Sequence, residues 1–128
     1  RPMTVTEGIF EIGNPDENSP VMVTTNFALT YFIVSGEIEA SKVPAWLLIK
    51  DSEGLSVLTA WAAGKFGGDD VGMFVKKCGI MDKVKHTELI IPGYAAAIAG
   101  DVEEELSGWA ITVGPREAAH IAGFLKSR

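Results

Sequence analysis

Four short apolar runs, each followed by turn residues and then by a helical pattern, most constrain how this chain of 128 residues can fold. Unbroken runs of this length, rich in β-branched residues, are typical of strands that are buried on both faces. A strand followed by a helix, four times over, predicts parallel βαβ units with helices on both faces of the sheet. We therefore predict an α/β fold with a Rossmann-like (flavodoxin-like) open parallel sheet. The four runs are Val21-Met22-Val23-Thr24-Thr25, Trp46-Leu47-Leu48-Ile49, Glu88-Leu89-Ile90-Ile91 and Trp109-Ala110-Ile111-Thr112-Val113.

Apolar residues recur at helical spacing between these runs, which predicts amphipathic helices. We expect Asp69 or Asp70 to cap the helix that precedes the third strand, and Gly79 to end it in a left-handed conformation. Two further helices are expected over residues 95–106 and 117–126. The side chains expected to face the core are Leu29, Phe32, Ile33, Trp61, Phe66, Val71, Phe74, Val75 and Cys78, and Leu55 and Leu58 lie on the same apolar stripe as Trp61.

The first twenty residues have a different pattern from the rest. Thr4-Val5-Thr6 and Ile9-Phe10-Glu11-Ile12 are short and alternating, and a turn-rich link over 14–20 follows them. We expect residues 1–20 to form an N-terminal arm or edge hairpin and residues 21–128 to form the ligand-binding domain. Because the chain opens with Arg1 and not with methionine, we expect a processed chain or a piece of a longer one.

Composition excludes several classes of function. With 17 acidic and 11 basic residues, the net charge of −6 does not suit a protein that follows a phosphate backbone or an anionic membrane surface. A single cysteine, Cys78, excludes an internal disulfide and a multi-thiolate metal site, and on an apolar stripe it is expected to act as a small apolar residue. No apolar run approaches the ~20 residues that a membrane-spanning helix needs. We therefore expect a cytoplasmic protein without nucleic-acid or membrane partners.

The loops at the carboxyl ends of the predicted strands are the expected ligand site, because open parallel sheets bind ligands there. None of the usual motifs fits them: the loop at 24–27 has no glycine for a dinucleotide, Gly64-Lys65 does not complete a P-loop, and 54–58 lacks the second glycine of a nucleophile elbow. The loops combine small, hydroxyl-bearing and apolar residues. Such loops favour a large, flat, mostly neutral ligand over acid–base catalysis, because the backbone can approach a ligand closely at glycine.

Gly54-Leu55-Ser56-Val57-Leu58 resembles the glycine–leucine–serine signature of cobalamin-binding domains. More specifically, four segments resemble the C-terminal corrinoid-binding domain of the corrinoid/iron–sulfur protein large (gamma) subunit of the acetyl-CoA decarbonylase/synthase complex. These segments are 14–27, 51–66, 91–95 and 113–118, so the resemblance runs across almost the whole chain. In methionine-synthase-like domains the signature follows the third strand, whereas here it follows the second predicted strand.

The resemblance implies a methyl carrier of the acetyl-CoA (Wood–Ljungdahl) pathway of anaerobes. Its corrinoid accepts a methyl group from methyltetrahydrofolate or a methyl-pterin through a methyltransferase and delivers it to acetyl-CoA synthase. The implied partners also include the small subunit of the corrinoid/iron–sulfur protein and a reductive activator, and an iron–sulfur cluster is expected only in a separate N-terminal domain. No catalytic residue and no metal ligand is expected in this chain. The residues assigned to the cofactor are Thr25, Asn26, Gly54, Leu55, Ser56, Leu58, Thr59, Pro92, Gly93, Tyr94, Ala95, Gly114, Pro115 and Arg116.

The expected state of the cobalt follows from a departure from the methionine-synthase pattern. Those domains carry a cobalt-ligating histidine in the loop after the first strand, where this chain has Thr25-Asn26-Phe27-Ala28-Leu29-Thr30. His86 precedes the third strand and His120 falls in the last predicted helix, so neither is expected to be a ligand. We therefore expect a base-off corrinoid without a protein ligand to cobalt. Weak axial donation makes the low-valent states of the metal easier to reach, because the axial ligand influences its reduction potential.

Simpler interpretations of the same residues remain open. Ser56 and Thr59 are equally consistent with capping the helix that follows them. Gly93 and Gly114 would serve an ordinary turn as well as a close approach to a ligand. Two other functions are also compatible with the sequence: a flavodoxin-like protein that binds FMN, and a ligand-free domain that docks onto another protein.

Overall fold

The computed structural model describes residues 3–128 and confirms the predicted α/β architecture. The sheet order is β1-β3-β2-β4-β5, with β2, β3, β4 and β5 parallel and β1 antiparallel to β3 at one edge. All five residues of β2 are buried, as its apolar run predicts for a strand covered on both faces. The strands are β1 (Gly8–Ile12), β2 (Val21–Thr25), β3 (Ala45–Lys50), β4 (Glu88–Ile91) and β5 (Ala110–Val113).

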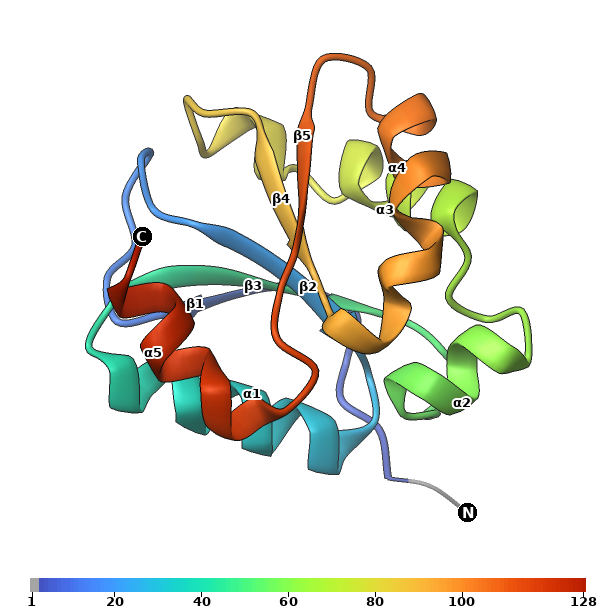
Figure 1. The fold of residues 1–128 in the computed structure, drawn as a ribbon, viewed down its shortest axis with the longest axis horizontal. Coiled ribbons are helices and arrows are strands. Elements are labelled where there is room, and N and C mark those ends of the chain that lie inside the picture. The colour runs from blue at the N-terminus through green and yellow to red at the C-terminus, as the bar shows by residue number, and fades with distance from the viewer. Residues whose placement is uncertain (1–2) are drawn as a thin grey trace.

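Helices cover both faces of this sheet (Figure 1). The α-helices are α1 (Ala28–Ser41), α2 (Val57–Ala62), α3 (Gly68–Lys77), α4 (Ala99–Glu105) and α5 (Ile121–Lys126), and short 3-10 helices are η1 (Ile80–Asp82), η2 (Gly93–Ile98) and η3 (Ala118–His120). Two apolar cores result. One joins Val21 and Val23 of β2 to α3 and α4, and the other joins Met22 of β2 to α1 and α5. No helix within residues 3–128 combines the length and the apolar character needed to cross a membrane.

The buried face of α1 differs from the predicted one. Leu29, Phe32 and Ile33 were expected in the core, but they are 57%, 65% and 46% exposed. The helix instead buries Ile38 together with small residues such as Ser35, which let its backbone approach the sheet. Because apolar residues lie all round this helix, their spacing alone could not select the inward side.

A similar correction applies to α2 and the region after it. Trp61 was expected to be buried and is 41% exposed, because the six-residue α2 turns only Ala60 fully inward. Leu58 on the same helix is 50% exposed. Phe66, by contrast, is fully buried as expected. The predicted helix over 95–106 is divided between η2 and α4, with non-helical backbone at Ala95.

The ends of α3 confirm one expectation and correct another. Gly79 has a φ of 96°, the left-handed conformation expected where this helix ends. At the other end the N-cap is Gly67, not Asp69 or Asp70. Both aspartates lie in the first turn, where their negative charge interacts favourably with the helix dipole. Gly68 and Gly72 place α3 against α4: a methyl group at Gly68 would lie 2.4 Å from Cβ of Asp101.

The N-terminal segment forms one edge strand and no hairpin within the described residues. β1 pairs with β3 from Gly8↔Ile49 to Ile12↔Ala45, and Thr4 bridges to Phe27 beyond it. Residues 3–7 therefore run past the carboxyl ends of β2 and β3. The division of the chain at residue 20 stays a prediction.

Candidate functional site

The topological switch point, where the order of the strands reverses, lies between β2 and β4. The chain leaves β2 for α1 on one face, whereas it leaves β4 for η2 and α4 on the other. These two strands pair only through Met22 and Ile90, and β4 ends at Ile91, so the last residues of β2 are paired by β3 alone. A crevice at such a point is where open α/β sheets bind ligands.

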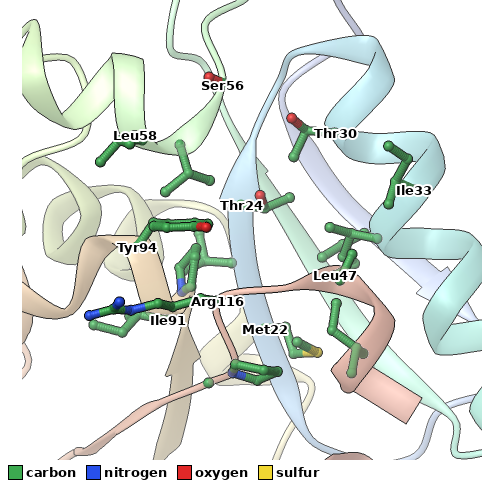
Figure 2. A pocket seen from close by; sticks show the side chains of 18 residues that line it. Met22, Thr24, Thr30, Ile33, Leu47, Ser56, Leu58, Ile91, Tyr94 and Arg116 are labelled. Atoms are coloured by element: carbon green, nitrogen blue, oxygen red, sulfur yellow. The ribbon is translucent and has the colours of Figure 1, made fainter.

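A cavity of about 280 Å³ occupies this crevice. Its walls come from β2, from α1, from the start of α2, and from the ends of β4 and β5 with η3 (Figure 2). The lining is Met22, Val23, Thr24, Thr30, Ile33, Val34, Leu47, Ser56, Val57, Leu58, Ile91, Pro92, Tyr94, Gly114, Pro115, Arg116, Ala118 and Ile121. Most of these side chains are apolar, and the hydroxyls of Thr24, Thr30 and Ser56 add a few polar groups, as ligand cavities generally have.

Several apolar side chains at the cavity rim are exposed to solvent. Ile33 on α1, Leu58 on α2 and Tyr94 in η2 all line the cavity and are 46%, 50% and 41% exposed. In Figure 2, Ile33 with Thr30 and Leu58 with Tyr94 stand on opposite sides of the cavity. The site is therefore an open apolar shelf, suited to covering part of a large ligand.

A tight backbone contact joins the loops that follow β4 and β5. The amide of Gly93 donates to the carbonyl oxygen of Pro115 at 3.2 Å, and the amide of Gly114 donates to that of Ile91 at 2.8 Å. A methyl group at Gly93 would lie 2.6 Å from the amide nitrogen of Arg116 and 2.7 Å from the carbonyl oxygen of Gly114. Gly93 therefore has a defined role in the site, although its surface does not line the cavity.

Polar contacts at the rim hold Tyr94 in place. Its hydroxyl donates to Oε1 of Glu117 at 2.7 Å, and the guanidinium of Arg116 lies 6.0 Å from the centre of its ring. The hydrogen bond to Glu117 and the negative charge of that carboxylate raise the pKa of Tyr94. Tyr94 is therefore a neutral phenol at physiological pH.

Asn26 has a different role from the one its position suggested. The residue is 6% exposed, and its side-chain Oδ1 accepts hydrogen bonds from the amides of Ser52 and Gly54 and from the hydroxyl of Ser52. Its Nδ2 donates to Oδ1 of Asp51. The amide thus binds the loop between β3 and α2 and does not line the cavity.

The structure brings together half of the predicted cofactor residues. Those that line the cavity are Ser56, Leu58, Pro92, Tyr94, Gly114, Pro115 and Arg116. The others, Thr25, Asn26, Gly54, Leu55, Thr59, Gly93 and Ala95, lie beside the lining or behind it. Gly54 with Glu53 forms a left-handed turn, Ala95 is fully buried, and the hydroxyl of Thr59 pairs with that of Ser56 at 3.2 Å. The side chain of Ser56 makes no helix-capping hydrogen bond within residues 3–128.

Sequence reasoning missed the floor and one wall of the cavity. Met22 and Leu47 are ordinary strand residues, and Ile33, Val34 and Ile121 lie on helices, so no motif marks them. One signal was present: the first half of α1 carries apolar residues on more than one side, so that some of them, Ile33 among them, have no place in the core. Thr25 is fully buried, and its hydroxyl has no hydrogen-bond partner among the described residues.

Neither histidine lines the cavity. His86 lies near the amino end of β4, where its ring nitrogens face the carbonyl oxygen of Ser19 and the amide of Glu88. His120 is exposed at the end of η3, immediately before α5 and not inside it as expected. Within residues 3–128 no three histidine, cysteine or acidic side chains are grouped so that they could hold a metal ion.

Comparison with known proteins extends over nearly the whole chain. Residues 1–125 match the family described as CO dehydrogenase/acetyl-CoA synthase delta subunit. The chain is similar to the corrinoid/iron–sulfur protein large subunit of Moorella thermoacetica, with 50% identity over 98% of the chain and 28% of that relative. It is similar to the acetyl-CoA decarbonylase/synthase complex subunit gamma of Methanopyrus kandleri, with 45% identity over 98% of the chain and 27% of that relative, and to that of Methanocaldococcus jannaschii, with 41% identity over 99% and 26%.

The chain thus spans little more than a quarter of the length of these curated relatives. The comparisons do not confirm the expected position at the C-terminal end of the longer subunit. The activity and the partners of the relatives belong to proteins much longer than the part that aligns here.

Proposed function

Because the chain belongs to the CO dehydrogenase/acetyl-CoA synthase delta subunit family, we propose that it is a corrinoid-binding module of a methyl carrier. The observation that carries this proposal is the open apolar cavity at the switch point between β2 and β4. Relatives named as corrinoid/iron–sulfur protein large subunit and as gamma subunits of the acetyl-CoA decarbonylase/synthase complex support the choice of ligand.

The size and chemistry of the cavity fit one part of a corrinoid and not the whole of it. A corrin macrocycle with its side chains is larger than about 280 Å³, so the cavity would not enclose it. The exposed rim formed by Ile33, Leu58 and Tyr94 continues the apolar surface outward, as a shelf beneath a flat macrocycle requires. The opposite face of the ligand would then be covered from outside these residues.

The chain's own residues would bind and orient the group. When bound, a corrinoid supplies a cobalt centre that can accept and pass on a methyl group. The apolar walls around Leu47 and Ile91 would exclude water, and the hydroxyls of Thr24, Thr30 and Ser56 would donate to or accept from polar groups on the ligand. The lining within residues 3–128 includes no histidine that could supply an imidazole, and a base-off state of the bound corrinoid is part of the proposal.

The proposed partners follow from this role. A methyltransferase acting on methyltetrahydrofolate or a related pterin would supply the methyl group, and acetyl-CoA synthase would receive it. A small corrinoid/iron–sulfur subunit would cover the ligand, and a reductive activator would restore the low-valent cobalt. Such partners are consistent with an acidic chain that exposes the apolar side chains of Ile33, Leu58 and Tyr94 at the cavity rim.

The deciding experiment is a titration of the complete purified protein with hydroxocobalamin, followed by visible absorbance. We expect saturable binding with a shift to the base-off spectrum. Ile33→Glu places a charge at the exposed rim of the cavity and should abolish the shift, because the bound ligand would cover this charge and burying it without a partner is costly. Met73→Glu is the matched control: Met73 is 42% exposed on α3 and outside the cavity lining, so its variant should bind normally.

The same titration with FMN separates the proposal from the flavin alternative. The strand order is flavodoxin-like, and flavodoxins bind FMN at the equivalent switch point. The loop after β2 lacks the glycines of a phosphate-binding turn, however, and Asn26 in it is already bonded to protein groups. Binding of FMN without binding of hydroxocobalamin would overturn the corrinoid proposal.

A further inference from the structure

The loop between β3 and α2 supplies one wall of the cavity through its last residues and the first turn of α2. Ser56, Val57 and Leu58 line the cavity, and they directly follow a turn at 51–54. That turn contains two consecutive left-handed residues, Glu53 with a φ of 59° and Gly54 with a φ of 78°. A non-glycine residue in this conformation is strained and persists only where its surroundings hold it there.

The group that holds the turn is the side-chain amide of Asn26. Its Oδ1 accepts from the amide of Ser52 at 2.9 Å, from the hydroxyl of Ser52 at 3.0 Å and from the amide of Gly54 at 3.0 Å. These donors lie on either side of Glu53, so one oxygen atom fixes both ends of the strained residue. With 6% of its surface exposed, the amide is shielded from water that would compete for these bonds.

The other end of the amide ties the turn to two further segments. Nδ2 donates to Oδ1 of Asp51 at 3.1 Å and to the carbonyl oxygen of Val5 at 3.4 Å. The same Asp51 oxygen accepts from the amide of Glu53 at 2.9 Å. Asn26 and Asp51 directly follow the paired residues Thr25 and Lys50 at the ends of β2 and β3, so the amide joins neighbouring strand ends.

We infer that Asn26 is a positioning residue for the ligand: it holds the turn at 51–54 in the one shape that sets Ser56, Val57 and Leu58 along the cavity wall. This inference rests on the proposed corrinoid-binding function. Asn26 itself touches no ligand, because its amide is consumed by protein partners. Asn26 affects affinity through the turn. Within residues 3–128, no other buried side chain forms hydrogen bonds to both Ser52 and Gly54.

An exchange of side chains tests the role directly in the complete purified protein. Asn26→Asp keeps an acceptor oxygen for Ser52 and Gly54, but it removes the donor and sets a second carboxylate against Asp51. The double variant Asn26→Asp with Asp51→Asn restores an amide–carboxylate pair with reversed direction and leaves the net charge of the native protein unchanged. Asn18→Asp is the matched control, since Asn18 is exposed in the turn before β2 and its side chain makes no hydrogen bond in the described part of the chain.

Two readouts are followed, the affinity for hydroxocobalamin and the hydrogen exchange of the Ser52 and Gly54 amides without ligand. For Asn26→Asp we expect affinity to fall roughly tenfold or more, because the hydrogen bonds to Asp51 and Val5 are lost and repulsion between the two carboxylates pulls the acceptor oxygen away from the turn. The two amides should exchange faster in the same variant. The double variant should recover most of both properties, and Asn18→Asp should match the native protein in both.

A destabilised core variant separates positioning from general stability. Val71→Ala removes a fully buried side chain on α3, away from the cavity lining, and should lower the melting temperature without weakening the affinity. The inference is overturned if Asn26→Asp binds hydroxocobalamin like the native protein, if the double variant recovers neither property, or if Val71→Ala weakens binding as much. If the native protein itself does not bind hydroxocobalamin, the proposed function fails, and the role of Asn26 toward that ligand fails with it.

Discussion

Replacing Gly93 by alanine tests whether the loops after β4 and β5 are held together by direct backbone contact. The added methyl group would lie 2.6 Å from the amide nitrogen of Arg116, and 2.7 Å from both the carbonyl oxygen of Gly114 and the carbonyl carbon of Pro115. These are backbone atoms on a neighbouring loop, so no side chain can rotate to make room. The two loops must therefore separate.

The cost has two parts. Forcing an extra methyl group into a packed site costs about 1–3 kcal/mol. Separation also weakens the hydrogen bonds that Gly93 and Gly114 donate to Pro115 and Ile91, each of which contributes about 0.5–1.5 kcal/mol. We therefore expect a loss of roughly 2–4 kcal/mol in the free energy of unfolding. For a domain of this size the melting temperature should fall by about 6–16 °C.

The assay is thermal and urea unfolding of the native and variant proteins, followed by circular dichroism. Gly100→Ala is the matched control, because Gly100 lies on α4 with nothing within 4 Å of the added methyl group. Alanine there should raise stability by about 0.5–1 kcal/mol, as it does within an exposed helix. If Gly93→Ala were as stable as the native protein or as Gly100→Ala, the backbone contact would not be what closes this side of the cavity.

Three further predictions concern other parts of the molecule. Glu117→Gln should lower the pKa of Tyr94, so that phenolate absorbance appears at a lower pH, and Tyr94→Phe identifies the signal. Because the pKa of Tyr94 in the folded protein is raised above 10.0, the hydrogen bond to Glu117 is intact at neutral pH and is lost only when the pH rises through that pKa. Burial raises the pKa of the Cys78 thiol, so a disulfide reagent at neutral pH should modify this thiol more slowly in the native protein than in guanidinium. Equal rates would contradict the half-buried position of Cys78. Gly68→Ala and Gly72→Ala should each destabilise the protein by about 1–3 kcal/mol, because the added methyl groups would lie 2.4 Å from Cβ of Asp101 and 2.5 Å from Cβ of Glu105, and side-chain rotation cannot move a Cβ atom. Unfolding curves like that of the native protein would argue against close contact between α3 and α4.

The centre of the sheet could be predicted from the sequence because β2, β3 and β4 are buried on both faces, whereas the edge strand β5, expected to be covered as well, has no buried residue. Runs such as Val21–Thr25 and Glu88–Ile91 have no polar alternation, and their short length and β-branched residues favour a covered parallel strand over a buried helix. The position of the cavity also agrees with the expected ligand site, since parallel strands bring their carboxyl ends to one edge.

The inward face of α1 and the roles of individual loop residues could not be predicted. In a helix that is apolar all round, the face that packs is selected by fit to the sheet, and here small residues such as Ser35 fit better than Phe32. Asn26 was assigned to the ligand because it follows a strand end, but its bonds to Ser52 and Gly54 depend on a turn more than twenty residues away. Periodicity reports neither kind of long-range contact.

The cavity draws its lining from both apolar layers of the domain. Val23 and Ile91 belong to the core beneath α3 and α4, whereas Leu47 and Ile121 belong to the core beneath α1 and α5. A ligand bound there would contact both layers at once. Its binding free energy would therefore raise the free energy of unfolding of the whole domain and not that of one layer alone. Probes placed in either layer would therefore record the same rise in melting temperature when the cavity is filled.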